Sequence, residues 1–314
     1  MASAPDVVAA AWGDRRSAEA GVLFVMFLWA ANYVVVKLAV SETAPAGFNF
    51  LRMVVAAVPL LVVLRARTGT IALPRRDLVA MAALGAVGFS LYQLLWGTAL
   101  LTTSAGDSAL IIGSAPALIA LLAVLVGADR FTWGKAAGVA LALIGIAFIV
   151  SSESGFHLET AGVGDALTLG AAACWAIYVA VGTPVFRRVS AVAVAAWAVT
   201  FGAIWLSPFA APDLLRDPGS YLQPGALLAL AYSGLFAVGL SQVLVSRAIP
   251  ALGPIRFANI QFLMAPLAVL MGAIALGEQI RPGEIAGGVV IVGGVLLSRR
   301  DVALPAWLRR LRPA

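Results

Sequence analysis

Polar side chains interrupt the apolar runs of this chain at spacings that would place them on one face of a helix. Trp29, Tyr33 and Lys37 follow one another at intervals of four residues, and Asn32 stands beside them. Residues spaced in this way share a helix face. Since Asn32 lies deep within its run, we expect Trp29 and Asn32 to line an internal cavity. Lys37 either joins that cavity or extends its amine to the nearest polar boundary.

Arg52 is the most telling of the charged residues. It follows Asn49 by three positions and lies about two turns inside an apolar run, where insertion scales put the cost of a charge at roughly 2.5–3.5 kcal/mol. The guanidinium could bind a carboxylate ligand or form an internal ion pair, and Asp107 is the expected partner. Asp107 is also our candidate for proton coupling, because apolar surroundings favour the neutral form of a carboxyl group.

Further aromatic and amide side chains fall inside apolar runs rather than at their ends. The additional candidates for substrate contact are Tyr92, Gln93, Trp96, Trp175, Tyr178, Gln242 and Asn259. Interfacial Trp and Tyr gather near the ends of spans, so this placement favours a cavity with aromatic walls. Pro116 and Pro266 are expected to bend their helices and to serve in gating, since proline frees a carbonyl that must then be satisfied inside the bundle.

The composition explains why these polar residues stand out. The 314 residues are 62% hydrophobic and 11% charged, with a mean hydropathy of +0.99. In a protein whose surface faces water, about a quarter of all residues are charged. Most of the surface of this chain must therefore face membrane lipid. The net charge of +6 sits on single or paired basic residues, which argues against nucleic-acid binding. The partners that we expect are a small-molecule substrate and lipid, for a monomer or a weak homodimer.

Ten apolar runs are long enough to cross a hydrocarbon core roughly 30 Å thick. They cover residues 21–40, 46–65, 78–101, 104–127, 133–151, 162–184, 190–210, 224–246, 254–277 and 283–298. If the N-terminus is cytoplasmic, seventeen of the 21 Lys and Arg residues fall in cytoplasmic segments, and only Arg216 and Arg281 fall outside. This bias predicts an inner-membrane protein with both termini in the cytoplasm.

The two halves of the chain repeat each other. Six matching positions recur at offsets of 146 to 150 residues. They pair Trp29 with Trp175, Gln93 with Gln242, Ala99 with Ala248, Pro116 with Pro266, Gly138 with Gly287 and Gly145 with Gly294. Because each half holds an odd number of spans, the second half must be inserted upside down. We therefore expect an all-α integral membrane protein with two inverted five-helix repeats, residues 20–151 and 152–298, flanked by segments 1–19 and 299–314.

Short motifs in both halves give the chain a family resemblance over residues 20–300. They are Leu28-Trp29 with Asn32-Tyr33, Phe50-Leu51-Arg52, the run from Trp96 to Ala105, Ser114-Ala115-Pro116, Met264-Ala265-Pro266 and Leu276-Gly277-Glu278. In these segments the chain resembles the EamA family of the drug/metabolite transporter superfamily. Asp129 stands where that family usually has Glu. The resemblance implies a ten-helix transporter with a central cavity and leaves its cargo open.

Enzyme chemistry has little support in the sequence. The chain has no phosphate-binding Gly-Lys-Ser/Thr loop, and His157 is its only histidine, so we expect no ATP hydrolysis, no metal site and no cofactor. Our leading hypothesis is alternating-access export of amino acids or similar small polar metabolites. Efflux of drugs or organic cations is the alternative, and a membrane-embedded transferase is a third candidate.

Overall fold

Long apolar runs give the described part of the chain a wholly helical structure. The computed structural model describes residues 15–39, 43–99, 111–130, 132–154, 162–277 and 280–298, and no strand occurs within these ranges. A helix satisfies its backbone groups internally, as apolar surroundings demand. The helices of the first half are α2 (Arg15–Ala39), α3 (Pro45–Thr68), α4 (Arg75–Gly85), η1 (Ala86–Leu91), α5 (Tyr92–Ala99), α7 (Ala115–Leu125) and α8 (Trp133–Ser154). The helices of the second half are α9 (Val163–Arg188), α10 (Ala191–Arg216), η3 (Ser220–Leu222), α11 (Pro224–Ala231), η4 (Tyr232–Leu240), α12 (Ser241–Leu252), α13 (Pro254–Gln261), α14 (Met264–Leu276) and α15 (Pro282–Ser298).

Seven of the described helices are long and apolar enough to cross a membrane. Three shorter apolar helices, Ile111–Leu125, Trp133–Phe148 and Pro282–Leu297, coincide with predicted spans four, five and ten. Large apolar side chains such as Val62, Trp205 and Phe209 are more than half exposed, as a lipid-facing surface requires. The prediction of an all-α, multi-pass membrane protein is confirmed, whereas the count of ten spans stays a prediction.

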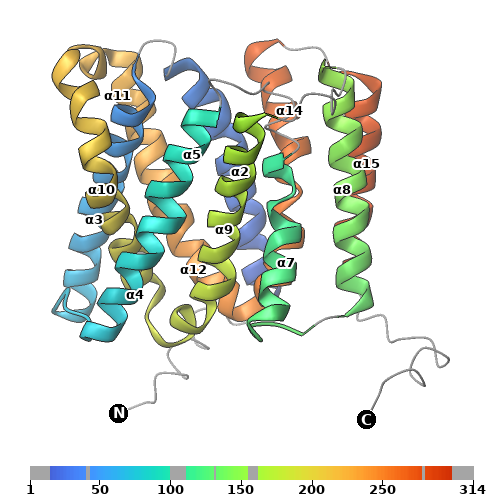
Figure 1. Ribbon diagram of the computed structural model, residues 1–314, viewed down its shortest axis with the longest axis horizontal. Coiled ribbons are helices and arrows are strands. Elements are labelled where there is room, and N and C mark those ends of the chain that lie inside the picture. The colour runs from blue at the N-terminus through green and yellow to red at the C-terminus, as the bar shows by residue number, and fades with distance from the viewer. Residues whose placement is uncertain are drawn as a thin grey trace.

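The helices stand side by side, and their packing partners follow a regular scheme (Figure 1). α8 and α15 form a pair at one edge of the bundle, and α3 and α10 lie together at the opposite edge. Between these pairs, α2 packs against α12 and α14, while α9 packs against α5 and α7. Each of these contacts that a helix of the first half makes therefore has a counterpart made by the matching helix of the second half.

Glycines bring α8 and α15 into close backbone contact. A Cβ at Gly145 would lie 2.6 Å from the carbonyl oxygen of Gly287, and a Cβ at Gly294 would lie 2.8 Å from that of Gly138. Small residues at such crossings let two helices approach closely, which drives association where lipid removes the hydrophobic force. Gly138 pairs with Gly294 and Gly145 with Gly287, so these two matching helices run antiparallel.

Two widened helical segments interrupt otherwise regular rods. η1 joins α4 to α5 and η4 joins α11 to α12, and both are π-helices. They end immediately before Tyr92 and Ser241, which are 149 residues apart, so the two halves carry the same irregularity at the same register. π segments are uncommon and occur frequently at functional sites. Neither π-helix was predicted from the sequence.

A short turn interrupts regular helix just before each of the two prolines expected to bend their helices. α7 starts after a turn at Ser114, and α14 starts after a turn at Phe262 and Leu263. Pro116 and Pro266 stand in the first residues of these helices, where a missing N–H costs nothing. The irregularity that was expected at each proline therefore lies within the residues that precede it. The role of the two prolines in gating stays a prediction.

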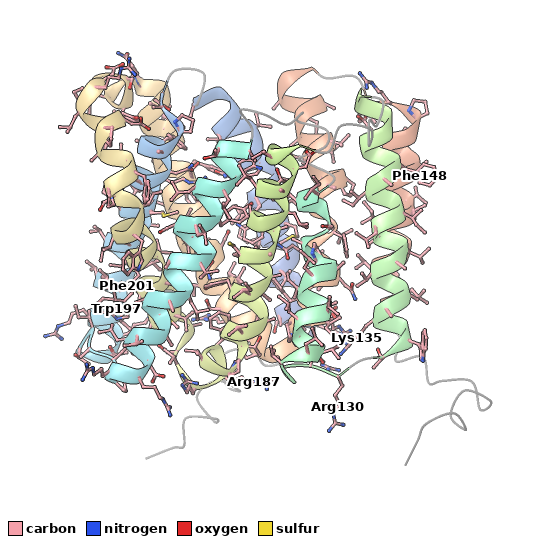
Figure 2. The ribbon with its side chains drawn as sticks, viewed as in Figure 1. Arg130, Lys135, Phe148, Arg187, Trp197 and Phe201 are labelled. Atoms are coloured by element: carbon pink, nitrogen blue, oxygen red, sulfur yellow. The ribbon has the colours of Figure 1, made fainter. Side chains whose placement is uncertain are left out.

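Polar contacts tie the two halves together at both ends of the bundle. At one end, which holds the side chains of Arg187, Lys135 and Arg130, first-half carboxylates meet second-half groups (Figure 2). These contacts are Asp77 with Arg188 at 2.7 Å, Glu19 with Arg256 at 2.8 Å, and Asp129 with the Ile255 amide at 3.3 Å. At the other end, the Gly47 amide donates to Asp213 and the Tyr221 phenol donates to the Ala44 carbonyl. Burial, aided by the charge of Asp213, raises the pKa of Tyr221, so its hydroxyl stays a donor.

The glycine contact between α8 and α15 predicts a stability difference between two identical substitutions. Gly145→Val should lower the thermal midpoint of the purified protein, because overpacking of this kind costs about 1–3 kcal/mol. Gly293→Val, on the same helix pair, should change the midpoint little, since a Cβ at Gly293 meets no described residue within 4 Å. Thermal unfolding in detergent, followed by size exclusion, measures both. Equal midpoints for the two variants would contradict the proposed packing.

Candidate functional site

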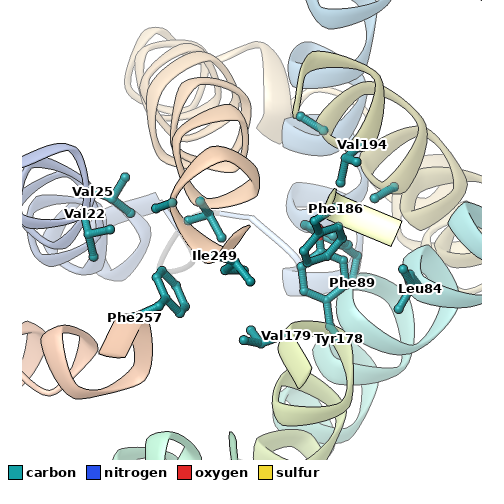
Figure 3. Packing of buried hydrophobic residues seen from close by; sticks show 14 of the residues in the cluster. Val22, Val25, Leu84, Phe89, Tyr178, Val179, Phe186, Val194, Ile249 and Phe257 are labelled. Atoms are coloured by element: carbon teal, nitrogen blue, oxygen red, sulfur yellow. The ribbon is translucent and has the colours of Figure 1, made fainter. Parts of the chain in front are cut away.

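An aromatic cluster lies where the two halves meet. Trp29 of α2 contacts Trp175 of α9 edge to face, with ring centroids 5.7 Å apart, and Trp175 stacks on Tyr178 at 5.4 Å. Tyr178 in turn packs against Phe89 of η1 and Phe186 of α9 (Figure 3). The structure therefore brings together three predicted site residues, Trp29, Trp175 and Tyr178, from opposite halves.

Tyr178 and Gln242 form a buried polar contact through the Gln242 amide nitrogen. The Gln242 amide nitrogen donates to the Tyr178 hydroxyl and also lies 3.4 Å from the Ser246 hydroxyl oxygen. All three side chains are at most 3% exposed. Both residues were predicted to contact substrate, but in this arrangement they bond to each other. Ser246, which the sequence analysis did not name, completes the cluster.

The polar groups of α2 bond to the π-helix η4. The Trp29 indole donates to the Ala237 carbonyl at 2.9 Å, and the Tyr232 hydroxyl donates to the Leu28 carbonyl at 3.2 Å. The Ser233 hydroxyl donates to the Asn32 side-chain oxygen. The indole N–H of Trp29 and the side-chain oxygen of Asn32 therefore fix α2 against the other half, which was not predicted. The side chains of Tyr33 and Lys37 lie outside the described part of the structure.

Arg52 is a buried cation without a countercharge among the described residues. It is 8% exposed, and its Nε has no hydrogen-bond partner there. By contrast, Arg188, Lys135 and Arg256 each lie within 2.8 Å of a carboxylate. The predicted partner of Arg52, Asp107, falls outside the described residues, so that ion pair stays a prediction.

Aromatic groups of α5 lie next to this cation. The phenol of Tyr92 is close enough to the Arg52 guanidinium to interact with it electrostatically. Tyr92 and Trp96, one helical turn apart, stack with their ring centroids 6.5 Å apart. Three predicted site residues from α3 and α5 therefore combine a charge with a flat aromatic surface.

Several amide and indole groups in the interior also lack partners. Within the described residues, buried polar atoms without a hydrogen bond include Gln93 Oε1, Trp175 Nε1, Gln261 Oε1 and both amide atoms of Asn259. Asn259 is only 1% exposed. More than nine in ten buried polar groups in proteins are satisfied, so each exception needs a water or a ligand. This group contains three predicted residues, Gln93, Trp175 and Asn259.

Two hollows lined by described residues lie away from these polar groups. One is a shallow surface site beside Asp217 and Gln223. The other is an apolar groove between α14 and α15, with Pro266 at one wall and Glu284 at the other. The Glu284 carboxylate accepts the Arg281 amide at 2.7 Å and caps the start of α15. The central cavity implied by the family resemblance stays a prediction.

These observations define a multi-pass membrane protein with a polar and aromatic interior between two similar halves. The family model described as the EamA-like transporter family matches residues 16–151 and again residues 162–300. The chain therefore belongs to the EamA-like transporter family, as the resemblance in its motifs suggested. It is a transporter of small molecules rather than an enzyme.

Known proteins similar to this chain extend over nearly its whole length. A relative from Streptantibioticus cattleyicolor, named "Probable terminal-alkyne amino-acid exporter", is 28% identical over 89% of this chain and 92% of its own. A relative from Salmonella typhimurium, named "Probable amino-acid metabolite efflux pump", is 24% identical over 88% and 92%. A solved crystal structure superposes with a TM-score of 0.76 at 18% identity and covers 96% of this chain and 100% of the other. At that identity it shows the fold alone.

The contact between Tyr178 and Gln242 predicts a compensating pair of substitutions. Tyr178→Phe should destabilise the protein by about 1–3 kcal/mol, because it leaves the Gln242 amide buried with one partner fewer. Adding Gln242→Leu should restore much of that loss, since both polar groups are then removed together. Thermal midpoints of the two single variants and the double variant measure the coupling. Additive losses would mean that the two side chains do not depend on each other.

Proposed function

We propose that the protein exports amino acids or closely related small polar metabolites by alternating access. Membership of a transporter family supports transport, and the names of the two relatives support amino-acid cargo. Arg52 is the single observation that carries the proposal furthest. A cation held inside apolar surroundings is costly, and it is kept where an anion can reach it.

The chemistry around Arg52 suits a carboxylate. A guanidinium presents a planar fork of donors that matches the two oxygens of a carboxylate group. Because Arg52 has no resident countercharge among the described residues, a substrate carboxylate would supply the missing partner. The stacked rings of Tyr92 and Trp96 offer an apolar surface beside the charge. An amino acid has the charged group and the side chain that this combination would bind.

Alternating access needs two halves that can exchange conformations. We propose that residues 20–151 and 152–298 are inverted five-helix repeats, which together cross the membrane ten times, between terminal segments 1–19 and 299–314. The antiparallel packing of α8 and α15, the matching π segments and the two separate ranges matched by the family model support this reading. Inverted repeats are a recurrent design of secondary transporters.

The distribution of charge supports an orientation in the bacterial inner membrane. Basic residues gather in the segments that the proposed topology places in the cytoplasm, together with both termini. The ion pairs of Asp77 with Arg188 and of Glu19 with Arg256 then lie at the cytoplasmic side and join the two halves there. An exporter loads from this side, so these contacts have to open for substrate to enter. We propose a monomer or a weak homodimer.

Gating and coupling complete the proposal. The helix breaks before Pro116 and Pro266 give each half one interrupted helix at the same register, which would let its two segments move separately. Asp107, outside the described residues, is the proposed group for proton coupling. We propose that Lys37 and Tyr33 line the substrate pathway along α2.

Efflux of organic cations remains the rival function. A cation would have to approach Arg52, and like charges in low dielectric repel strongly. The rival therefore requires Arg52 to be neutralised by a resident carboxylate. For a membrane-embedded transferase, no group of three or more His, Cys, Asp or Glu residues that could hold a metal ion occurs in the part of the chain that the structure describes. Transport assays with matched acidic, zwitterionic and cationic solutes separate these possibilities.

Replacement of Arg52 tests the proposal in reconstituted proteoliposomes. Arg52→Gln should raise the KM for amino acids about ten- to a hundredfold, because a charge-assisted hydrogen bond contributes about 1.5–3 kcal/mol. Arg52→Lys should restore only part of this, since an ammonium keeps the charge but loses the fork. Arg216→Gln, at an exposed position, is the matched control and should transport like the original protein.

Unchanged amino-acid KM values in Arg52→Gln protein that is folded and monodisperse would exclude Arg52 as the carboxylate site. Uptake of a lipophilic cation that Arg52→Gln accelerates would instead favour the rival function. Size-exclusion profiles and thermal midpoints of each variant establish that lost transport does not reflect lost folding.

A further inference from the structure

The two halves differ at one pair of matching helices in the interior. α5 begins at Tyr92 and α12 begins at Ser241, and each follows a π-helix. In this register, offset by 149 residues, Gln93 corresponds to Gln242 and Gly97 to Ser246. Both pairs are spaced by four residues, so each Gln shares a helix face with the Gly or Ser that follows it.

In the second half this position is filled by the protein itself. Gln242 donates to the Tyr178 hydroxyl, and the Ser246 hydroxyl oxygen lies 3.4 Å from its amide nitrogen. Tyr178 also packs onto Gly88, where a Cβ would lie 2.6 Å from the ring. The amide nitrogen of the second-half glutamine is therefore held by two partners from the protein itself.

In the first half the same position is open. Gln93 Oε1 is buried and has no hydrogen-bond partner among the described residues. A Cβ built at Gly97 meets no atom of the described residues within 4 Å, so none of them fills the space that Ser246 occupies in the other half. In the register that pairs Trp29 with Trp175, Tyr178 corresponds to Asn32, whose side-chain oxygen already accepts a hydrogen bond from the Ser233 hydroxyl. Among the described residues, no contact like those of Gln242 with Tyr178 and Ser246 therefore holds Gln93 Oε1.

The open position lies on the inner side of its helix. Exposed Thr98 of α5 lies on the side of the helix away from Gln93, which fixes the outward direction. α3 packs against α5, and Tyr92, the residue before Gln93, interacts electrostatically with the Arg52 guanidinium. Within the described part of the chain, an acceptor oxygen without a donor, an unfilled volume and a cation without a countercharge thus come from α3 and α5, two helices that pack against each other.

We propose that Gln93 and Gly97 form the substrate-selecting position of the transporter, an inference that rests on the proposed amino-acid export. Gln93 Oε1 is an acceptor that needs a hydrogen-bond donor. The ammonium group of an amino acid supplies that donor, while Arg52 binds the carboxylate of the same molecule. Gly97 leaves room for the substrate side chain beside these two groups. The matching cluster of Tyr178, Gln242 and Ser246 is the structural counterpart and does not bind substrate.

Two substitutions at Gly97 test the two parts of this inference. Gly97→Val should reduce kcat/KM for amino acids with large side chains at least about tenfold relative to alanine, because it fills the volume that those side chains need. Gly97→Ser copies the second half and gives Gln93 an internal partner, so it should weaken amino-acid binding for all side-chain sizes. Proteoliposome uptake of alanine, leucine and phenylalanine measures the ranking.

Gln93→Leu separates amine recognition from size selection. This variant should raise the KM for amino acids about tenfold, while carboxylic acids that lack the amine should compete as well as they do with the original protein. Ser246→Ala is the matched control in the second half, and it should leave the ranking of substrates unchanged even if the thermal midpoint falls.

The outcomes distinguish this inference from the proposed function. If the original protein moves no amino acid, the proposed function fails. If the original protein transports amino acids but folded Gly97→Val leaves the size ranking unchanged, Gly97 is not the selecting position. Equal weakening of amino acids and amine-free acids by Gln93→Leu would overturn the assignment of the ammonium site.

Discussion

Lipid hydrocarbon offers no hydrogen-bond partner, and this constraint determines which polar groups the interior of the protein can hold. A polar atom inside the bundle must be satisfied by protein, by water or by a ligand. The amide nitrogen of Gln242 is satisfied by protein, because Tyr178 and Ser246 accept its hydrogen bonds. Arg52 and Gln93 are not satisfied in this way among the described residues. The difference between these groups, rather than polarity alone, separates structural contacts from proposed substrate contacts.

The duplicated architecture explains where rigid and adjustable parts lie. The glycine contact between α8 and α15 joins two matching helices through their backbones, and such contacts resist deformation because packed interfaces have few alternative arrangements. The π segments η1 and η4 and the turns before Pro116 and Pro266 occur at equivalent positions, so each half has the same places at which its helices depart from regular geometry. Similar units with similar weak points can exchange conformations at small cost, which is the physical basis proposed for alternating access.

Much of the fold, but less of the site, could be predicted from the sequence. Hydropathy located the helices because lipid-facing segments must be apolar almost throughout, and the family motifs were strong enough to identify the transporter family. The partners of individual polar groups could not be predicted, because they depend on the approach of distant helices. Asn32 bonds to Ser233 and Trp29 bonds to Ala237, and both contacts join residues about 200 positions apart. Gly97 was not predicted as a site residue, because a glycine has no side chain whose chemistry would draw attention to it. The repeat register does match it with Ser246.

Counterflow with the unaltered protein tests the central claim most directly. Proteoliposomes preloaded with an unlabelled neutral amino acid would be diluted into trace radiolabelled amino acid, with analogues that lack the carboxylate as competitors. We expect transient accumulation of label that free amino acids abolish and that decarboxylated amines leave unaffected, because the interior cation requires a carboxylate partner. No accumulation, or inhibition by the amines as strong as by the amino acids, would contradict the claim that this interior carries substrates by their carboxylate.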